Sequence, residues 1–141
     1  MLSKEQIDAY LEPMTAEQSA SIRSIRDMIA ELNLHLHEEI DKGKWFGGLL
    51  TYYTEDRIHA YALGPLTGGF TTFHMMPFYG SKTLQERHGP ALKKLLSGKS
   101  CIKFKTYSQI PEDALRDILA ATPKYAELAR EMFAARKKKS P

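Results

Sequence analysis

Residues 101–107 alternate in a way that places a thiol and two lysines on one side of a strand. One set is Ile102, Phe104 and Thr106, and the other is Cys101, Lys103, Lys105 and Tyr107. This period of two predicts a strand whose first set faces a core, because lysines are rarely buried without a partner. A nearby ammonium group lowers the pKa of a thiol and favours the nucleophilic thiolate. Cys101 is therefore a candidate nucleophile.

Nucleophilic catalysis would also need a base that a third group orients. His59 and His74 are the candidate bases, but their spacing in the chain cannot place either imidazole beside Cys101. Other catalytic motifs are missing. The run Gly98-Lys99-Ser100 is not a P-loop, because Lys93 stands where the motif needs a glycine and because a helix is expected before it. There is no nucleophile elbow, zinc helix, dinucleotide fingerprint or zinc knuckle.

The outward face of the predicted sheet is rich in aromatic and basic side chains. We expect Ile58, Ala60 and Ala62 to face the helices, so the opposite face collects His59, Tyr61, Lys103, Lys105 and Tyr107, with Trp45 as a further aromatic wall. Aromatic walls with a few cations suit a small anionic ligand. The alternatives are an ordinary solvated sheet face and, for Trp45, a place in the core beside Phe46.

A second polar group follows the first long helix, where two histidines and several acids crowd together. At helical spacing His35 would face Glu38 and Glu39, with Asp41 close by. Such a set could hold Fe(II), Zn(II) or Mn(II), with water completing the shell. The alternative is a polar helix end with histidine near the last carbonyl groups, which the helix dipole favours.

The periodicity of the chain predicts helices at both ends of a sheet. Capping boxes begin helices at Ser3 and Thr15, and the second helix continues to Leu32. Strands are expected at 49–54, 57–63, 70–76 and 101–107, with the first two forming a hairpin. A helix from Ser81 should break at Gly89-Pro90 and continue to Ser97, where Gly98 ends it. Further helices are expected over 111–122 and from 123 onward.

Length and composition indicate one domain over residues 1–141. One cysteine, the lack of an apolar run of membrane length and an N-terminus without a leader pattern predict a cytoplasmic protein without a disulfide. The net charge is +3, but four of the 20 basic residues lie in the tail 136–139, so the other 16 nearly balance 17 acidic ones. Nucleic acid is therefore not the expected partner.

Two stretches of the chain resemble the YdhG-like family of bacterial domains, which was long labelled as of unknown function. The first is Gly98-Lys99-Ser100-Cys101-Ile102-Lys103-Phe104-Lys105, with Ile110-Pro111-Glu112-Asp113-Ala114-Leu115 opening the next helix. The second is Glu39-Ile40-Asp41-Lys42-Gly43-Lys44-Trp45 with Leu50-Thr51-Tyr52-Tyr53. The resemblance covers residues 15–122 and leaves 123–141 as a C-terminal helix and basic tail. It implies an α+β fold in which helices cover an antiparallel sheet of four to five strands.

Three functions follow from these observations. The first is a non-enzymatic binding module that presents the sheet face to a small anionic ligand or a partner protein. The alternative comes from one branch of the family, described as frataxin-like iron chaperones. In that case an oxygen-rich iron surface would form from Glu38, Glu39 and Asp41 with Glu112, Asp113 and Asp117. The third is a cysteine-dependent enzyme. An uncovered aromatic sheet face would also allow a homodimer.

Overall fold

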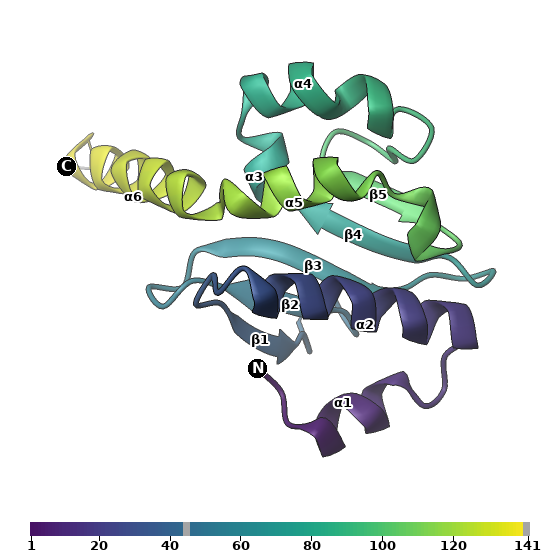
Figure 1. Cartoon of the computed structure of the whole chain (residues 1–141). Helices are drawn as coiled ribbons and strands as arrows, with labels where there is room; N and C mark the ends of the chain where they lie inside the picture. The colour runs from purple at the N-terminus through teal and green to yellow at the C-terminus, as the bar shows by residue number, and fades with distance from the viewer. Residues whose placement is uncertain (44–45, 140–141) are drawn as a thin grey trace.

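The protein is an α+β fold built on one five-stranded antiparallel sheet (Figure 1). The computed structural model describes residues 1–43 and 46–139. The strands follow one another in chain order across the sheet: β1 (His37–Ile40), β2 (Leu50–Tyr53), β3 (His59–Pro65), β4 (Thr71–Met75) and β5 (Cys101–Phe104). Strands β2 to β5 and the hairpin of β2 with β3 were predicted, whereas β1 lies in the segment that was considered at helical spacing.

Helices precede the sheet, interrupt it and follow it. They are α1 (Lys4–Leu11), α2 (Ala16–Glu31), α3 (Met76–Tyr79), α4 (Lys82–Leu92), α5 (Glu112–Ala120) and α6 (Thr122–Lys139), with a 3-10 turn η1 (Tyr107–Gln109) before α5. Both predicted capping boxes are present, at Ser3 and Thr15. α2 lies across the sheet, and the C-terminal part of α6 projects from the body (Figure 1).

The predicted break at Gly89-Pro90 is wrong, because α4 continues through both residues to Leu92. Pro90 has no N–H to donate to the Glu86 carbonyl, and the helix continues for only two residues beyond it. The helix also ends before the predicted Ser97. Gly98, at φ +87°, instead belongs to the turn that leads into β5, where the Ser97 N–H donates to the Cys101 carbonyl over 2.8 Å.

One face of the sheet forms the core against the helices. Its largest fully buried side chains come from β2, β3, β4, α3 and β5, namely Tyr52, Tyr61, Phe73, Phe78 and Phe104. The rings of Tyr61 and Phe73 are stacked, with centroids 5.1 Å apart. The Tyr61 hydroxyl lies 2.7 Å from Thr122 Oγ1 at the start of α6, so this strand also fixes the last helix.

A β-bulge in β3 decides which side chains reach this core. Tyr52 pairs with Tyr61 and Tyr53 pairs with His59, which leaves Ala60 as an extra residue in β3. An extra residue shifts the alternation by one position. Tyr61 therefore faces the helices while His59 lies on the opposite, outer face beside His74. The prediction that Ile58, Ala60 and Ala62 share the core face is wrong at Ala62, which pairs with His74 of the outer face, whereas Ala60 belongs to the core.

A buried ion pair joins β1 to α2. Both carboxylate oxygens of Glu38 accept from Arg26, over 2.7 Å each, and the Tyr52 hydroxyl and the Leu2 N–H also donate to this carboxylate, over 2.5 and 2.9 Å. The Glu38 side chain is fully buried, and burial alone would raise its pKa. The hydrogen bonds from Arg26 and Tyr52 outweigh that cost and lower the pKa of Glu38 below its usual value.

This network yields a stability prediction. Arg26→Leu leaves the buried Glu38 carboxylate without its cation, and we expect the free energy of unfolding to fall by about 3–5 kcal/mol. Urea unfolding followed by circular dichroism measures the change. The control is Arg23→Leu, one turn earlier on α2, whose pair with Asp8 is about half exposed. That substitution should cost about 1 kcal/mol or less. Equal losses in both variants would contradict the role given to Glu38.

Candidate functional site

The outer face of the sheet carries a group of rings and sulfur atoms that we call the outer-face cluster. It consists of Phe46 from the loop after β1, Tyr53, His59, His74, Met76, Ser100 and Cys101. Strands β2 to β5 supply most of it, because alternate residues of neighbouring strands point to the same side. The antiparallel register places His74 directly opposite Cys101 on β5.

The loop between β1 and β2 folds over this face. The Phe46 ring is stacked on His59 with centroids 4.8 Å apart, and it lies 5.1 Å from the His74 ring. Asp41 holds the loop in place by accepting from the backbone N–H groups of Gly43 and Phe46 over 3.0 and 2.9 Å. A Cβ at Gly64 would come within 2.3 Å of Leu49 Cδ2, so glycine lets the loop approach closely. The sheet face is thus partly covered by its own chain.

Each ring nitrogen of His74 lies within hydrogen-bonding distance of another side chain. Its Nδ1 lies 3.0 Å from Cys101 Sγ and 3.1 Å from Ser100 Oγ, and its Nε2 lies 3.2 Å from Met76 Sδ. A thioether can only accept a hydrogen bond. The arrangement therefore favours the tautomer that carries its proton on Nε2 and leaves the Nδ1 lone pair facing the thiol. This is the geometry of a base beside a nucleophile.

The imidazoles and the thiol of the cluster are held in their neutral forms. Burial and the neighbouring His74 lower the pKa of His59 to about 4, and burial lowers the pKa of His74. Burial raises the pKa of the Cys101 thiol, against a smaller opposing effect of the Ser100 hydroxyl. Both ring nitrogens of His59 are buried and have no hydrogen-bond partner among the described residues. The cluster is therefore uncharged at neutral pH.

Two lysines and an aromatic ring extend the outer face beyond the cluster. The ammonium nitrogens of Lys103 and Lys105 lie 4.3 and 4.7 Å from the centre of the Phe70 ring. Thr72 is opposite Lys103 in the β4–β5 register and lies on the same face. The structure thus brings both predicted lysines to the predicted face, in contact with a phenylalanine that the sequence did not single out.

The other predicted ligand-binding residues are dispersed. Tyr61 is fully buried in the core because of the bulge, so its assignment to the outer face is wrong. Tyr107 lies in η1, which packs against α2 on the helix side of the sheet, so it does not join the lysines either. His59 is on the outer face as predicted, within the cluster. Trp45 lies outside the described residues.

The four residues of the metal hypothesis do not converge. His35 precedes β1 and is exposed, while Glu38 and Glu39 are neighbours in a strand and point to opposite faces. Asp41 is engaged by its loop. The helical spacing on which the hypothesis depended is wrong, because the segment is extended. No group of three or more metal-ligating side chains from His, Cys, Asp and Glu is present among the described residues.

Four of the six carboxylates expected to form the surface of an iron chaperone are paired with arginines. Glu38 pairs with Arg26 and Glu39 with Arg57, in the first acidic group. In the second group the pairs are Glu112–Arg116, Asp117–Arg87 and Asp117–His88. Carboxylates that already bind guanidinium groups are poor ligands for a weakly held cation.

Sequence reasoning missed Phe46, Phe70, Met76 and Ser100. The only signal for Phe46 was its position between the glycines 43, 47 and 48, which mark a loop that can fold back.

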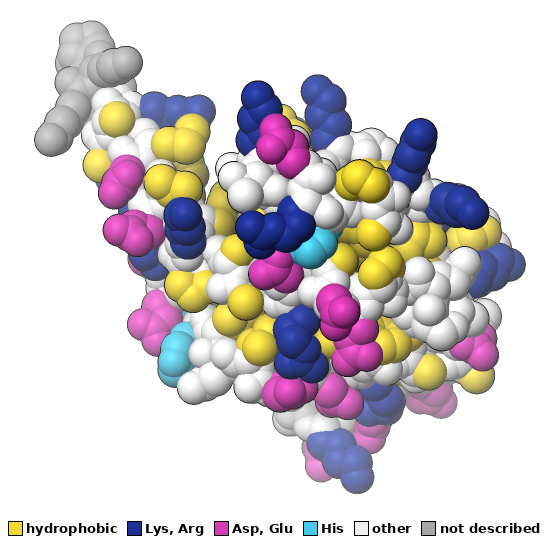
Figure 2. All heavy atoms as spheres, turned by 45° about the horizontal axis from the view of Figure 1, so that its top comes forward, with side chains coloured by type: hydrophobic (Ala, Val, Ile, Leu, Met, Phe, Trp, Pro, Cys, Tyr) yellow, Lys and Arg dark blue, Asp and Glu magenta, His cyan; other side chains and the backbone are white. Residues whose placement is uncertain are grey.

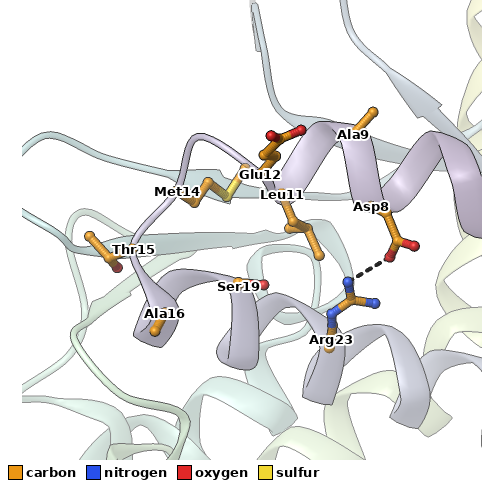
Figure 3. A pocket seen from close by; sticks show the side chains of 9 residues that line it. All are labelled: Asp8, Ala9, Leu11, Glu12, Met14, Thr15, Ala16, Ser19 and Arg23. Carbon is orange, nitrogen blue, oxygen red and sulfur yellow. Dashed lines mark hydrogen bonds and ion pairs between the residues drawn. The ribbon is translucent and has the colours of Figure 1, made fainter.

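A hollow of about 660 Å³ between α1 and α2 was also not predicted from the sequence (Figure 3). Asp8 and Arg23 form an ion pair across it, and it lies apart from the outer-face cluster. We assign no chemistry to this hollow.

No family model, no curated protein and no solved structure matches the chain. Membership of the YdhG-like family therefore stays a prediction. Within the described residues, no helix has both the length and the apolar character required to span a bilayer.

The low pKa of His59 gives a prediction about acid stability. Between pH 6.5 and about 4 the unfolded chain binds a proton at His59 that the folded protein does not, so stability falls as pH falls through this window. His59→Phe keeps a ring and removes the proton site. We expect the loss of stability between pH 7 and 4.5 to shrink by about 1–2 kcal/mol in this variant, allowing for the exposed part of the ring.

Urea unfolding at the two pH values measures this difference. The matched control is His37→Gln, which removes an exposed histidine of β1 and should retain the pH dependence of the unmodified protein. The same pH dependence in His59→Phe and in the unmodified protein would contradict the burial of a neutral imidazole.

Proposed function

We propose that the protein is a binding module for a small anionic ligand, with the site at Lys103, Lys105 and Phe70 on the outer face of the sheet. One observation carries the proposal. Two ammonium groups contact the same ring, and no ion pair of either lysine is found within the part of the chain that the structure describes.

Their shared contact with Phe70 sets Lys103 and Lys105 apart, because no described lysine forms an ion pair and those pairs are made by His88 and the arginines. Six arginines bind carboxylates: Arg23, Arg26, Arg57, Arg87, Arg116 and Arg130. Lys103 and Lys105 instead lie within about 9 Å of each other, where two unit charges in water repel by about 0.5 kcal/mol. An anion bound between them would add two attractions that outweigh this repulsion. Its binding would therefore gain more than a single lysine provides.

The neighbours of the lysines suggest what kind of anion fits. Phe70 is half-buried and offers an apolar surface. The Thr72 hydroxyl, opposite Lys103, can donate a hydrogen bond to an oxyanion. A carboxylate or phosphate ester with a small apolar or aromatic portion matches these groups. Small ligands are commonly held by an apolar wall and a few placed polar groups.

The proposal predicts a thermal shift that depends on Lys103. We expect phosphate, pyrophosphate or phenyl phosphate to raise the midpoint of unfolding, since a ligand at a hundredfold excess over its Kd stabilises the folded state by about 2.7 kcal/mol. Lys103→Ala should weaken binding by tenfold or more in isothermal titration, and Lys103→Arg should retain it because a guanidinium group is charged, binds phosphate and stacks on aromatic rings.

The control for this experiment is Lys99→Ala, an exposed lysine in the turn before β5. It should bind the probes as the unmodified protein does. Equal binding by the Lys103→Ala and Lys99→Ala variants would mean that the anions respond only to the net positive charge. The proposed site would then be rejected.

A thiol-dependent reaction is the second candidate, favoured by the 3.0 Å distance between Cys101 Sγ and His74 Nδ1. In such a reaction the thiol proton passes to Nδ1 while Sγ forms a bond to an electrophilic carbon, whose leaving group departs with the bonding electrons. Because burial raises the pKa of the thiol, little thiolate exists at neutral pH without this transfer.

Alkylation by iodoacetamide tests that candidate, because Cys101 is the one cysteine in the sequence and iodide is the leaving group. We expect His74→Gln to slow alkylation at pH 7 by about tenfold or more, given that a positioned base contributes about 10²–10⁴-fold. His37→Gln, on the other edge of the sheet, should leave the rate unchanged. Alkylation of His74→Gln as fast as that of the unmodified protein would exclude His74 as the base.

A further inference from the structure

Helix α6 carries apolar side chains beyond the point where it leaves the body. Ala126 and Ala129 are buried against the rest of the chain, whereas Leu128, Met132 and Phe133 are 47%, 58% and 50% exposed. The second half of α6 projects into solvent (Figure 1). Exposed apolar side chains that gather on one element commonly mark an interaction surface.

The apolar residues of α6 follow the spacing of a coiled coil. Ala121 precedes the helix, and the series continues through Tyr125, Leu128, Met132 and Ala135, at alternating intervals of four and three. Residues at this spacing form a stripe along one side of a helix and pack against a second helix. The charged residues Lys124 and Glu131 lie along one flank of the stripe, seven positions apart.

The first half of the stripe forms one wall of a groove. The groove has a volume of about 490 Å³, and Ala121, Tyr125 and Leu128 line it together with Pro77 and Leu84 from the region of α3 and α4. Figure 2 shows hydrophobic side chains in the hollow between α6 and the neighbouring body. The groove therefore offers an apolar surface next to the root of the projecting helix, with the charged side chains of Lys82, Arg87 and Asp117 also in its lining.

The two charges on this flank, Lys124 and Glu131, are opposite in sign and can pair with those of a second copy of the chain. Within the described chain, neither Lys124 nor Glu131 forms an ion pair. In an antiparallel pair of helices, equivalent flanks of the two chains face each other. Lys124 then meets Glu131 of the second copy, and Glu131 meets Lys124 of the second copy. A parallel pair would not bring these opposite charges together in this way.

The same register also matches the sizes of the apolar residues. If Lys124 lies beside Glu131 of the second copy, Tyr125 lies opposite Leu128 and Met132 lies opposite Ala121. At each end of the contact the large Met132 thus meets the small Ala121. Met132 of the second copy there enters the groove beside Leu84. Charge and size point to the same arrangement, although they depend on different residues.

We propose that two copies of this chain associate through α6, packed antiparallel about a two-fold axis. The contact is isologous, so each copy contributes the same stripe and the same groove, and the association closes at a dimer. The outer-face cluster and the lysine pair remain outside the contact. The dimer is thus independent of the proposed anion site.

Sedimentation equilibrium of the full chain over a range of concentrations tests the proposal. We expect a monomer–dimer equilibrium that Leu128→Asp shifts to the monomer. Lys124→Glu and Glu131→Lys should each raise the dimer Kd by fivefold or more, because each replaces two attractions by two repulsions. The double variant Lys124→Glu/Glu131→Lys should return the Kd to within about twofold of the starting value, since the pairs are then reversed rather than broken.

The control is Leu66→Asp, which changes an apolar side chain that is 37% exposed at the end of β3, away from α6. Its Kd should equal that of the unmodified chain, and circular dichroism confirms that each variant is folded. A monomer at every concentration, a dimer insensitive to Leu128→Asp, or a double charge reversal that fails to restore association would each overturn the proposal. So would an open series of oligomers, or a monomer that binds an acidic amphipathic peptide through the same groove.

Discussion

The extra residue in β3 is the constraint on which the rest of the molecule depends. Without Ala60 between the positions that pair with Tyr52 and Tyr53, the strand would keep a strict alternation. Tyr61 would then leave the core, or His59 would enter it. The bulge permits both of the observed positions: Tyr61 is stacked in the core and reaches the start of α6, while His59 joins the rings of the outer face. One residue therefore supports the core and the candidate site together.

Regular patterns in the sequence predicted most of the elements and both lysines of the proposed site. Capping residues located α1 and α2, and the alternation around Lys103 and Lys105 placed both lysines outside the core, as the structure has them. These signals are local: a cap or a strand face depends on residues a few positions apart. The fold class was likewise predictable, because its helices and strands each carry their own period.

What the sequence could not supply was the effect of partners distant in the chain. The bulge leaves no local signal, so Tyr61 was assigned to the wrong face. Glu38 was taken for a metal ligand because its partner Arg26 lies on α2, and only the pairing of β1 with β2 buries that carboxylate. His74 and Cys101 are 27 residues apart and meet through strand register alone. Without an alignment, register can be inferred only from patterns that a bulge disrupts.

The short segment before β5 has a consequence for how the folded protein behaves in a crowded solution. Its backbone bonds to the outer edge of β5: the Lys103 N–H donates to the Leu95 carbonyl over 2.9 Å, and Leu96 bridges to Ile102. A sheet edge with free backbone groups is a template for strand addition and for growth into fibrils. Here the β5 edge is already occupied, and the opposite edge strand β1 has four residues, two of them glutamates. The sheet is therefore poorly suited to extension by a further strand from another molecule.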